Sequence, residues 1–156
     1  MRCEVMCHFF ILMVLVFSSG TAMAQKQLPN EADLKTSYCL GVVRSTAAKH
    51  LPGSVDSLPE SVREGAELMR KQTLSDLLAR QQRLYNYLLP RLPYLDIMSL
   101  MAAKMQGEID SEMGSKELSS CIKQCATNSD CNSLCLRTPL MTKFQMCISE
   151  PTYLPY

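Results

Sequence analysis

Residues 121–135 read CIKQCATNSDCNSLC, and the spacing of their four cysteines decides most of the fold. Each half of this segment is a Cys-x3-Cys pair, and residues four apart lie on one face of a helix. Two such helices, joined by residues 126–130, can pack antiparallel, with Asp130 capping the second helix. Antiparallel packing places the two outer cysteines next to each other and the two inner cysteines next to each other. The predicted disulfides of this hairpin are therefore Cys121–Cys135 and Cys125–Cys131.

The other cysteines extend this framework to the rest of the chain. The sequence has eight cysteines, of which Cys3 and Cys7 precede an apolar run near the N-terminus. The remaining six are an even number, which in an exported chain is typical of three disulfides. Cys39 and Cys147 then pair and close a loop of about a hundred residues, a stabilisation on the order of 4–5 kcal/mol. Tetrahedral zinc held by the four hairpin thiolates is the alternative, although structural zinc sites usually have two-residue spacers.

The N-terminus predicts export. Residues 9–17 are uninterrupted apolar residues, and Ala22-Met23-Ala24 follows as a small-x-small cleavage site. The apolar run is shorter than the roughly 20 residues that a membrane-spanning helix needs. We therefore expect residues 1–24 to be a cleaved secretory signal peptide and residues 25–156 to be a single disulfide-stabilised helical domain. Its location would be periplasmic or extracellular.

Composition favours helices and gives no electrostatic case for a nucleic-acid partner. Lysine and arginine number 16 against 15 acidic residues, a net charge of +1, which attracts neither nucleic acid nor an anionic membrane. Tryptophan is absent and glycine is scarce, whereas leucine, methionine, alanine, glutamine, arginine and lysine are frequent. These residues lose little side-chain freedom in a helix. The prediction is an all-α fold, a small bundle of about four to five helices that ends in the stapled hairpin.

Capping residues and apolar periodicity place the helices before the hairpin. Asn30 can cap a first helix, which ends at Pro52-Gly53. Ser57 and Glu60 can form a capping box for a second helix, with Pro59 in its first turn and Pro90 at its end. The apolar stripe of the first helix comprises Leu34, Tyr38, Val42 and Thr46. That of the second comprises Val62, Ala66, Met69, Thr73, Leu77, Leu84 and Leu88.

A third helix is expected from about Leu95, with Gly107 and Gly114 weakening its far end. The acidic residues that alternate there resemble a calcium loop, but the glycine falls one place late and no glutamate occupies the twelfth position. A solvated, frayed segment is the favoured interpretation. The acidic residues concerned are Glu108, Asp110 and Glu112.

Methionines supply a candidate site for a soft metal ion. Met98, Met101 and Met105 place three thioethers on one helical face, and soft sulfur ligands select Cu(I). Methionine also fills irregular helical cores, which is the favoured interpretation here. No metal or other cofactor is therefore assigned.

Catalytic motifs are not found in the sequence. His50 is the one histidine after the predicted signal peptide, and its expected place is the end of a helix. No nucleophile elbow, zinc-protease motif or phosphate-binding glycine loop occurs. An enzyme that uses carboxylates alone stays open. The proline- and tyrosine-containing tail 151–156 is expected to pack across the helices, or to serve as a docking strand for a partner.

Two short resemblances bear on function without assigning a family. The paired Cys-x3-Cys segment 121–135 resembles plant α-hairpin peptides with antimicrobial or protease-inhibitor activity, over about fifteen residues. Residues 37–43, SYCLGVV, resemble the opening of small periplasmic immunity proteins that neutralise secreted bacterial toxins. The predicted function is an exported, non-catalytic helical binding protein with a protein partner, of an inhibitor or immunity type. The alternative is a periplasmic copper-handling protein that uses Met98, Met101 and Met105.

Overall fold

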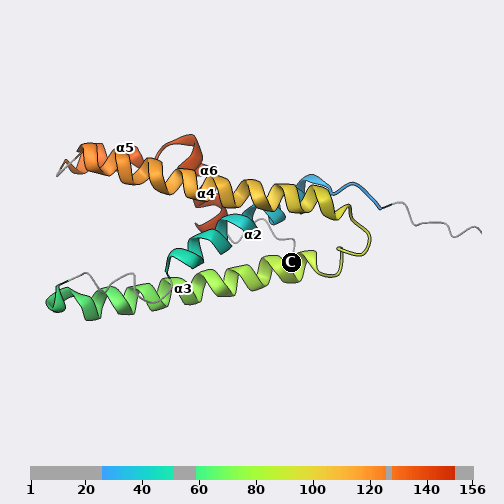
Figure 1. Cartoon of the computed structure of the whole chain (residues 1–156), viewed down its shortest axis with the longest axis horizontal. Coiled ribbons are helices and arrows are strands. Elements are labelled where there is room, and N and C mark those ends of the chain that lie inside the picture. Colours follow the sequence, from blue (N-terminus) through green and yellow to red (C-terminus); the bar gives the residue numbers. More distant parts are fainter. Residues whose placement is uncertain (1–25, 51–58, 126–127, 150–156) are drawn as a thin grey trace, which may run out of the picture.

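The computed structural model describes residues 26–50, 59–125 and 128–149. Within these residues the chain forms five helices and no strands, which confirms the predicted all-α bundle with a stapled C-terminal hairpin (Figure 1). The helices are α2 (Glu31–Lys49), α3 (Glu60–Leu88), α4 (Ile97–Cys125), α5 (Ser129–Cys135) and α6 (Pro139–Ser149). None of these described helices is long and apolar enough to cross a membrane. The predicted signal peptide, the Pro52-Gly53 stop and the tail 151–156 lie outside the described residues.

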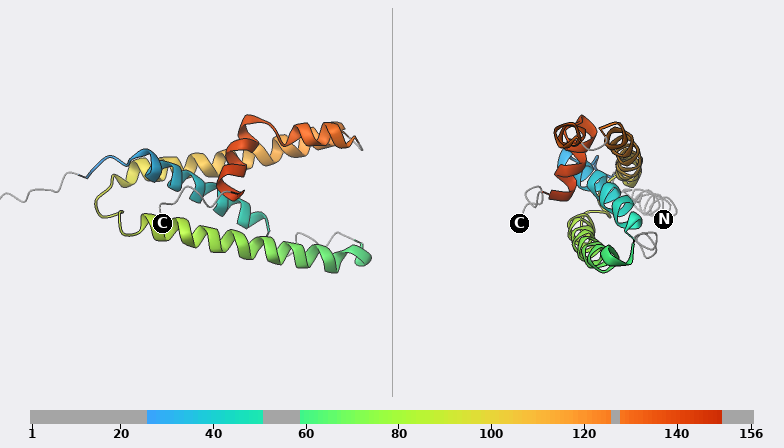
Figure 2. Two further views of the ribbon diagram at one scale, coloured as in Figure 1. Left: turned by 180° about the vertical axis from the view of Figure 1, so that it is seen from behind. Right: turned by 90° about the vertical axis from the view of Figure 1, so that its left-hand side faces the viewer.

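Helix α2 lies at the centre of the molecule, between α3 and α4 (Figures 1 and 2). Its residues Val42 and Val43 are fully buried and pack in one cluster with Leu77 and Leu84 of α3. A second apolar cluster closes the end of the molecule where α3 connects to α4. It consists of Leu88, Leu95 and Leu100. The two long helices are thus held together through α2 and at their connection.

Small residues bring α2 and α4 so close that their backbones touch. Gly41 of α2 lies against the backbone of Lys104, and Gly107 of α4 lies against the backbone of Tyr38. A Cβ atom at either glycine would overlap the carbonyl oxygen that it faces. Only glycine therefore fits at this crossing, because it alone has no side chain to place there.

Polar side chains satisfy backbone and hydroxyl groups along the same interface. The Ser37 hydroxyl donates to the carbonyl oxygen of Leu100 at 2.7 Å, and the hydroxyls of Thr46 and Ser111 lie 3.4 Å apart. Lys49, in the last turn of α2, donates from Nζ to the carbonyl oxygen of Ser111 at 3.1 Å. The contact between α2 and α4 is therefore specified by hydrogen bonds as well as by close packing, since each buried polar atom needs a partner.

Both ends of α2 are held by charged side chains. The predicted Asn30 cap is confirmed: its side-chain oxygen accepts from the Asp33 backbone N–H at 2.9 Å, and Asp33 accepts from the Asn30 N–H at 3.1 Å. Asp33 is fully buried and also pairs with Arg91 Nε at 2.7 Å. At the other end, buried Arg70 of α3 donates to the carbonyl oxygen of His50 at 2.5 Å. A cation is favourable there because helix carbonyls converge at a C-terminus.

Helix α3 buries only part of its predicted stripe. Leu77, Leu84 and Leu88 are buried, whereas Val62 and Met69 are exposed, because α3 extends beyond the end of α2 (Figure 1). Leu34, expected in the stripe of α2, is also exposed. Pro59 stands at the N-cap of α3, just before the first turn, and makes no side-chain capping bond. Ser57 lies outside the described residues.

Helix α4 is longer than its glycines suggest, and the expectation of a frayed far end is wrong. It runs without a break through Gly107 and Gly114 and ends at Cys125, so it also supplies the first arm of the hairpin. Burial against α2 offsets the low helix propensity of Gly107. Gly114 lies against the side chain of Leu140 of α6, at a distance where a Cβ would make ordinary contact.

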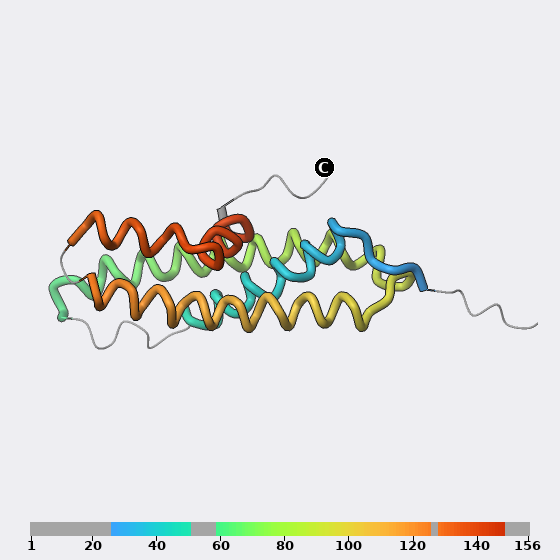
Figure 3. Tube along the Cα trace, turned by 90° about the horizontal axis from the view of Figure 1, so that it is seen from above, coloured from blue at the N-terminus to red at the C-terminus, as the bar shows by residue number. Residues whose placement is uncertain are grey.

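The hairpin turns α4 back into α5, and α6 then returns toward α2 (Figure 3). Disulfides join Cys121 to Cys135 and Cys125 to Cys131, and a third joins Cys39 of α2 to Cys147 of α6. The prediction that Asp130 caps α5 is wrong. Asn128 caps α5 instead, since its side-chain oxygen accepts from the Cys131 backbone N–H at 3.0 Å.

Candidate functional site

The outer side of α4 carries a row of exposed apolar side chains, which we call the methionine face. Its five side chains are spaced by three or four residues, so they follow one side of the helix over about four turns. All are exposed: Met98 by 72%, Met101 by 52%, Met105 by 56%, Ile109 by 48% and Met113 by 57%. The expectation that Met98, Met101 and Met105 fill the core is therefore wrong.

The opposite side of α4, which packs against α2 and α6, is built mainly from small residues. Its buried positions include Gly107, Ser111 and Gly114. A helix on a protein surface normally turns its large apolar side chains inward and its polar ones outward. In the middle of α4 this distribution is reversed, because the close approach of α2 leaves no room for large side chains. Packing within the described chain therefore does not explain the methionine face.

Four polar side chains of α4 beside the methionine face are bonded within the chain. Lys104 Nζ lies 2.7 Å from Glu108 Oε1, and Gln106 Nε2 donates to Asp110 Oδ1 at 2.7 Å. The Tyr38 hydroxyl donates to Asp110 Oδ2 at 2.8 Å. Burial, together with the Asp110 carboxylate, raises the pKa of Tyr38 above its ordinary value, so the phenol stays protonated and continues to donate. A molecule that covered the methionine face would therefore leave the hydrogen bonds and ion pairs of these groups intact.

An open cavity borders one end of the methionine face, between α4 and the start of α6. Its volume is about 510 Å³, and it is lined by Met113, Lys116, Glu117, Thr138, Pro139 and Leu140. Apolar lining combined with a few polar groups is typical of a binding pocket. The cavity therefore extends the methionine face with a recess that can accept an apolar side chain.

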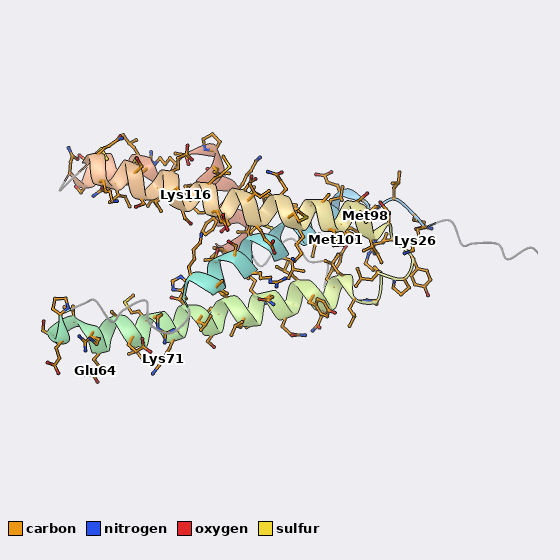
Figure 4. The ribbon with its side chains drawn as sticks, in the orientation of Figure 1. Lys26, Glu64, Lys71, Met98, Met101 and Lys116 are labelled. Atoms are coloured by element: carbon orange, nitrogen blue, oxygen red, sulfur yellow. A yellow bond between two sulfur atoms is a disulfide. The ribbon has the colours of Figure 1, made fainter. Side chains whose placement is uncertain are left out.

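The three methionines of the copper hypothesis lie on the first turns of α4, where Figure 4 labels Met98 and Met101. Met98 and Met101 are about one turn apart, and Met105 follows about one turn later. The structure keeps their side chains accessible to solvent. They can therefore offer thioether sulfur to a soft cation such as Cu(I).

The acidic residues of the calcium interpretation lie on an unbroken helix. Glu108 pairs with Lys104, and Asp110 is engaged by Tyr38. Carboxylates two positions apart on a helix point to different sides, because each residue turns the helix by about 100°. Glu108, Asp110 and Glu112 therefore do not form a calcium-binding loop.

The hairpin sulfurs form a tight cluster that is already used in covalent bonds. The Sγ atoms of Cys121, Cys125 and Cys135 all lie within 4.8 Å of one another. Cys125 Sγ lies 3.6 Å from Cys135 Sγ, although these two residues belong to different disulfides. Zinc binds thiolates, and disulfide sulfur carries no such charge. In this oxidised form the cluster staples the hairpin.

His50 occupies the C-cap of α2, as its sequence position suggests. Its backbone carbonyl accepts from Arg70, which gives this position a structural role at the end of the helix. The sequence has no recognised catalytic motif that includes His50.

Two residues of the methionine face were missed in the sequence. Ile109 and Met113 continue the spacing of Met98, Met101 and Met105 by two further steps of four residues. The signal was present, but it crosses Gly107, where the helix was expected to weaken. A glycine that packs against another backbone does not end a helix.

Comparisons with known proteins do not place the chain in a family: no family model, no curated protein and no solved structure matches it. The two resemblances read from the sequence stay limited to segments 121–135 and 37–43.

Proposed function

We propose that this protein is an exported, non-catalytic interaction module whose binding surface is the methionine face. One observation carries the proposal: in the middle of α4 the large apolar side chains point outward while the small residues point inward. Contiguous exposed apolar patches on proteins commonly mark interaction sites. Methionine suits such a surface because its flexible side chain adapts to the shape of a partner.

Covering this face would contribute substantially to the free energy of a complex. Fully burying a methionine or isoleucine side chain is worth about 1.5–3 kcal/mol. The five side chains of the face are each about half to three-quarters exposed, so each would contribute on the order of 1 kcal/mol on binding. The cavity beside Met113 adds a recess in which one partner side chain can be anchored.

Export fits this function. A disulfide framework suits an oxidising compartment, and the N-terminal apolar run with its small-x-small site is typical of a secretory signal. A helical frame with covalent ties presents α4 as a preorganised surface, which lowers the entropy cost of binding. An inhibitor or immunity-type protein stays our prediction.

The test is affinity capture from the exported fraction of the source cells with three matched variants. We expect the wild type, and a variant with Met101→Leu and Met105→Leu, to retain a stoichiometric protein, because leucine keeps the face apolar. A variant with Met101→Glu and Met105→Glu should lose it, because burying unpaired carboxylates is costly. Met69→Glu, at a methionine of α3 that is exposed by 72%, is the control that should still capture. Equal capture by all variants would refute the proposal.

The same variants separate the copper-handling alternative, which the exposure of Met98, Met101 and Met105 favours. Cu(I) titrated in competition with a chelator would bind the wild type stoichiometrically if the thioethers were the functional groups. The leucine variant lacks two of the three thioethers and would then lose the metal while keeping the apolar face. That pattern would support metal handling in place of protein binding.

A further inference from the structure

We propose that the occupant of the methionine face is a second copy of this chain, packed about a two-fold axis with the two α4 helices antiparallel. This inference rests on the proposed function and names the partner of the same site. A two-fold contact uses one patch on both molecules, so the patch must be complementary to itself. The methionine face meets this requirement in its apolar residues, in its charges and in its adjoining cavity.

The apolar residues are symmetric along the helix. The face extends from Met98 to Met113, and its midpoint falls between Met105 and Gln106. In an antiparallel pair centred there, Met98 meets the second copy's Met113 and Met101 meets the second copy's Ile109. Met105 lies next to its own equivalent at the axis. Every large apolar side chain of the face thereby gains an apolar neighbour.

The charges on one flank are centred within one residue of the same point. Lys104 and Glu108 lie four residues apart on this flank, and their midpoint is Gln106. Antiparallel helices bring equivalent flanks together, so Lys104 would face Glu108 of the second copy, and Glu108 would face its Lys104. Opposite charges therefore meet on this flank and like charges stay apart, which gives the contact its register.

The cavity beside Met113 completes the arrangement. Its walls include Met113, the residue that Met98 of the second copy would meet, together with Pro139 and Leu140 of α6. The two-fold axis places one such cavity at each end of the contact. The end-on view in Figure 2 shows that α2 and α3 lie to one side of α4, so within the described residues they do not obstruct an approach from the other side.

Sedimentation velocity of the oxidised full-length protein over a range of concentrations tests this inference. We expect the wild type, the Met101→Leu/Met105→Leu variant and the Met69→Glu control to form dimers. Met105→Glu sets two carboxylates against each other at the axis and should weaken dimerisation roughly hundredfold or more. Circular dichroism of each variant confirms that this exposed substitution leaves the helices intact.

A charge-pairing experiment tests the two-fold register itself. Lys104→Glu makes the flank wholly acidic and Glu108→Lys makes it wholly basic, so each variant alone should dimerise at least tenfold more weakly. Their equimolar mixture should form heterodimers, because acidic and basic flanks then face each other. Ion pairs within one chain cannot produce this rescue, because in each variant residues 104 and 108 of the same chain carry like charges.

Two outcomes overturn the inference. A wild type that sediments as a monomer at every concentration excludes self-docking, and a mixture that fails to associate excludes this register. If capture of a different protein still depends on Met101 and Met105, the proposed function survives while the second copy is rejected. If neither dimerisation nor capture depends on these residues, both proposals fail.

Discussion

Replacing Gly107 by alanine is expected to cost about 3 kcal/mol or more of the free energy of unfolding, one of the largest effects of any single methyl group in this chain. The added Cβ would overlap the carbonyl oxygen of Tyr38. A helix backbone cannot yield as a flexible side chain does, so α2 and α4 must separate. Alanine has the higher helix propensity by about 1 kcal/mol, so local preference and tertiary packing act in opposite directions. Chemical denaturation followed by circular dichroism measures which of the two prevails.

Gly65→Ala is the matched control for this prediction. Gly65 lies inside α3, and a Cβ built there meets no atom within 4 Å. Only helix propensity then changes, so this variant should gain roughly 0.5–1 kcal/mol. If Gly107→Ala also stabilised the protein, the close crossing of α2 and α4 would be wrong.

Removing the bond between Cys39 and Cys147 is expected to cost about 4–5 kcal/mol, because it closes a loop with a sequence separation of 108 residues. The unfolded chain gains more freedom from losing a long loop than from losing a short one. The double variant Cys39→Ala/Cys147→Ala, which leaves neither bond partner as a free thiol, should therefore show a sharply lowered denaturation midpoint.

Its matched control removes the inner bond of the hairpin. Cys125 and Cys131 are separated by 6 residues, and the same model gives about 2 kcal/mol for their disulfide. If Cys125→Ala/Cys131→Ala lowered the free energy of unfolding more than Cys39→Ala/Cys147→Ala does, the Cys39–Cys147 disulfide would not be the main stabilising link. A non-reduced peptide map establishes which cysteines are joined before either variant is compared.

Local signals were sufficient to predict α2, α3, the start of α4 and the way the hairpin is stapled. Asn30 and Asp33 form a reciprocal cap that can be recognised from a few adjacent residues. Pro90 ends the helical periodicity of the residues that precede it. The two Cys-x3-Cys pairs define one face each, so antiparallel packing follows from their spacing alone. In each case the deciding contact is close in sequence, which is why one sequence was enough.

The methionine face could not be assigned correctly, because its position depends on contacts distant in sequence. Periodic apolar residues indicate one side of a helix but do not say whether that side is inside. The approach of Gly41, sixty-six positions before Gly107, decides which side of α4 is buried. The same contact keeps α4 helical through Gly107, where propensity alone predicts a weak point.

Oxidative footprinting tests most directly whether the methionine face is a covered binding surface. Met98 and Met69 are both exposed by 72% in the single chain, so dilute hydrogen peroxide should convert both to sulfoxide at similar rates when the protein is dilute. In concentrated protein, and in complexes from the exported fraction, we expect Met98 and Met105 to oxidise several-fold more slowly while Met69 is unchanged. Mass spectrometry of the peptides gives each rate. Equal oxidation of Met98 and Met69 under all of these conditions would contradict the account.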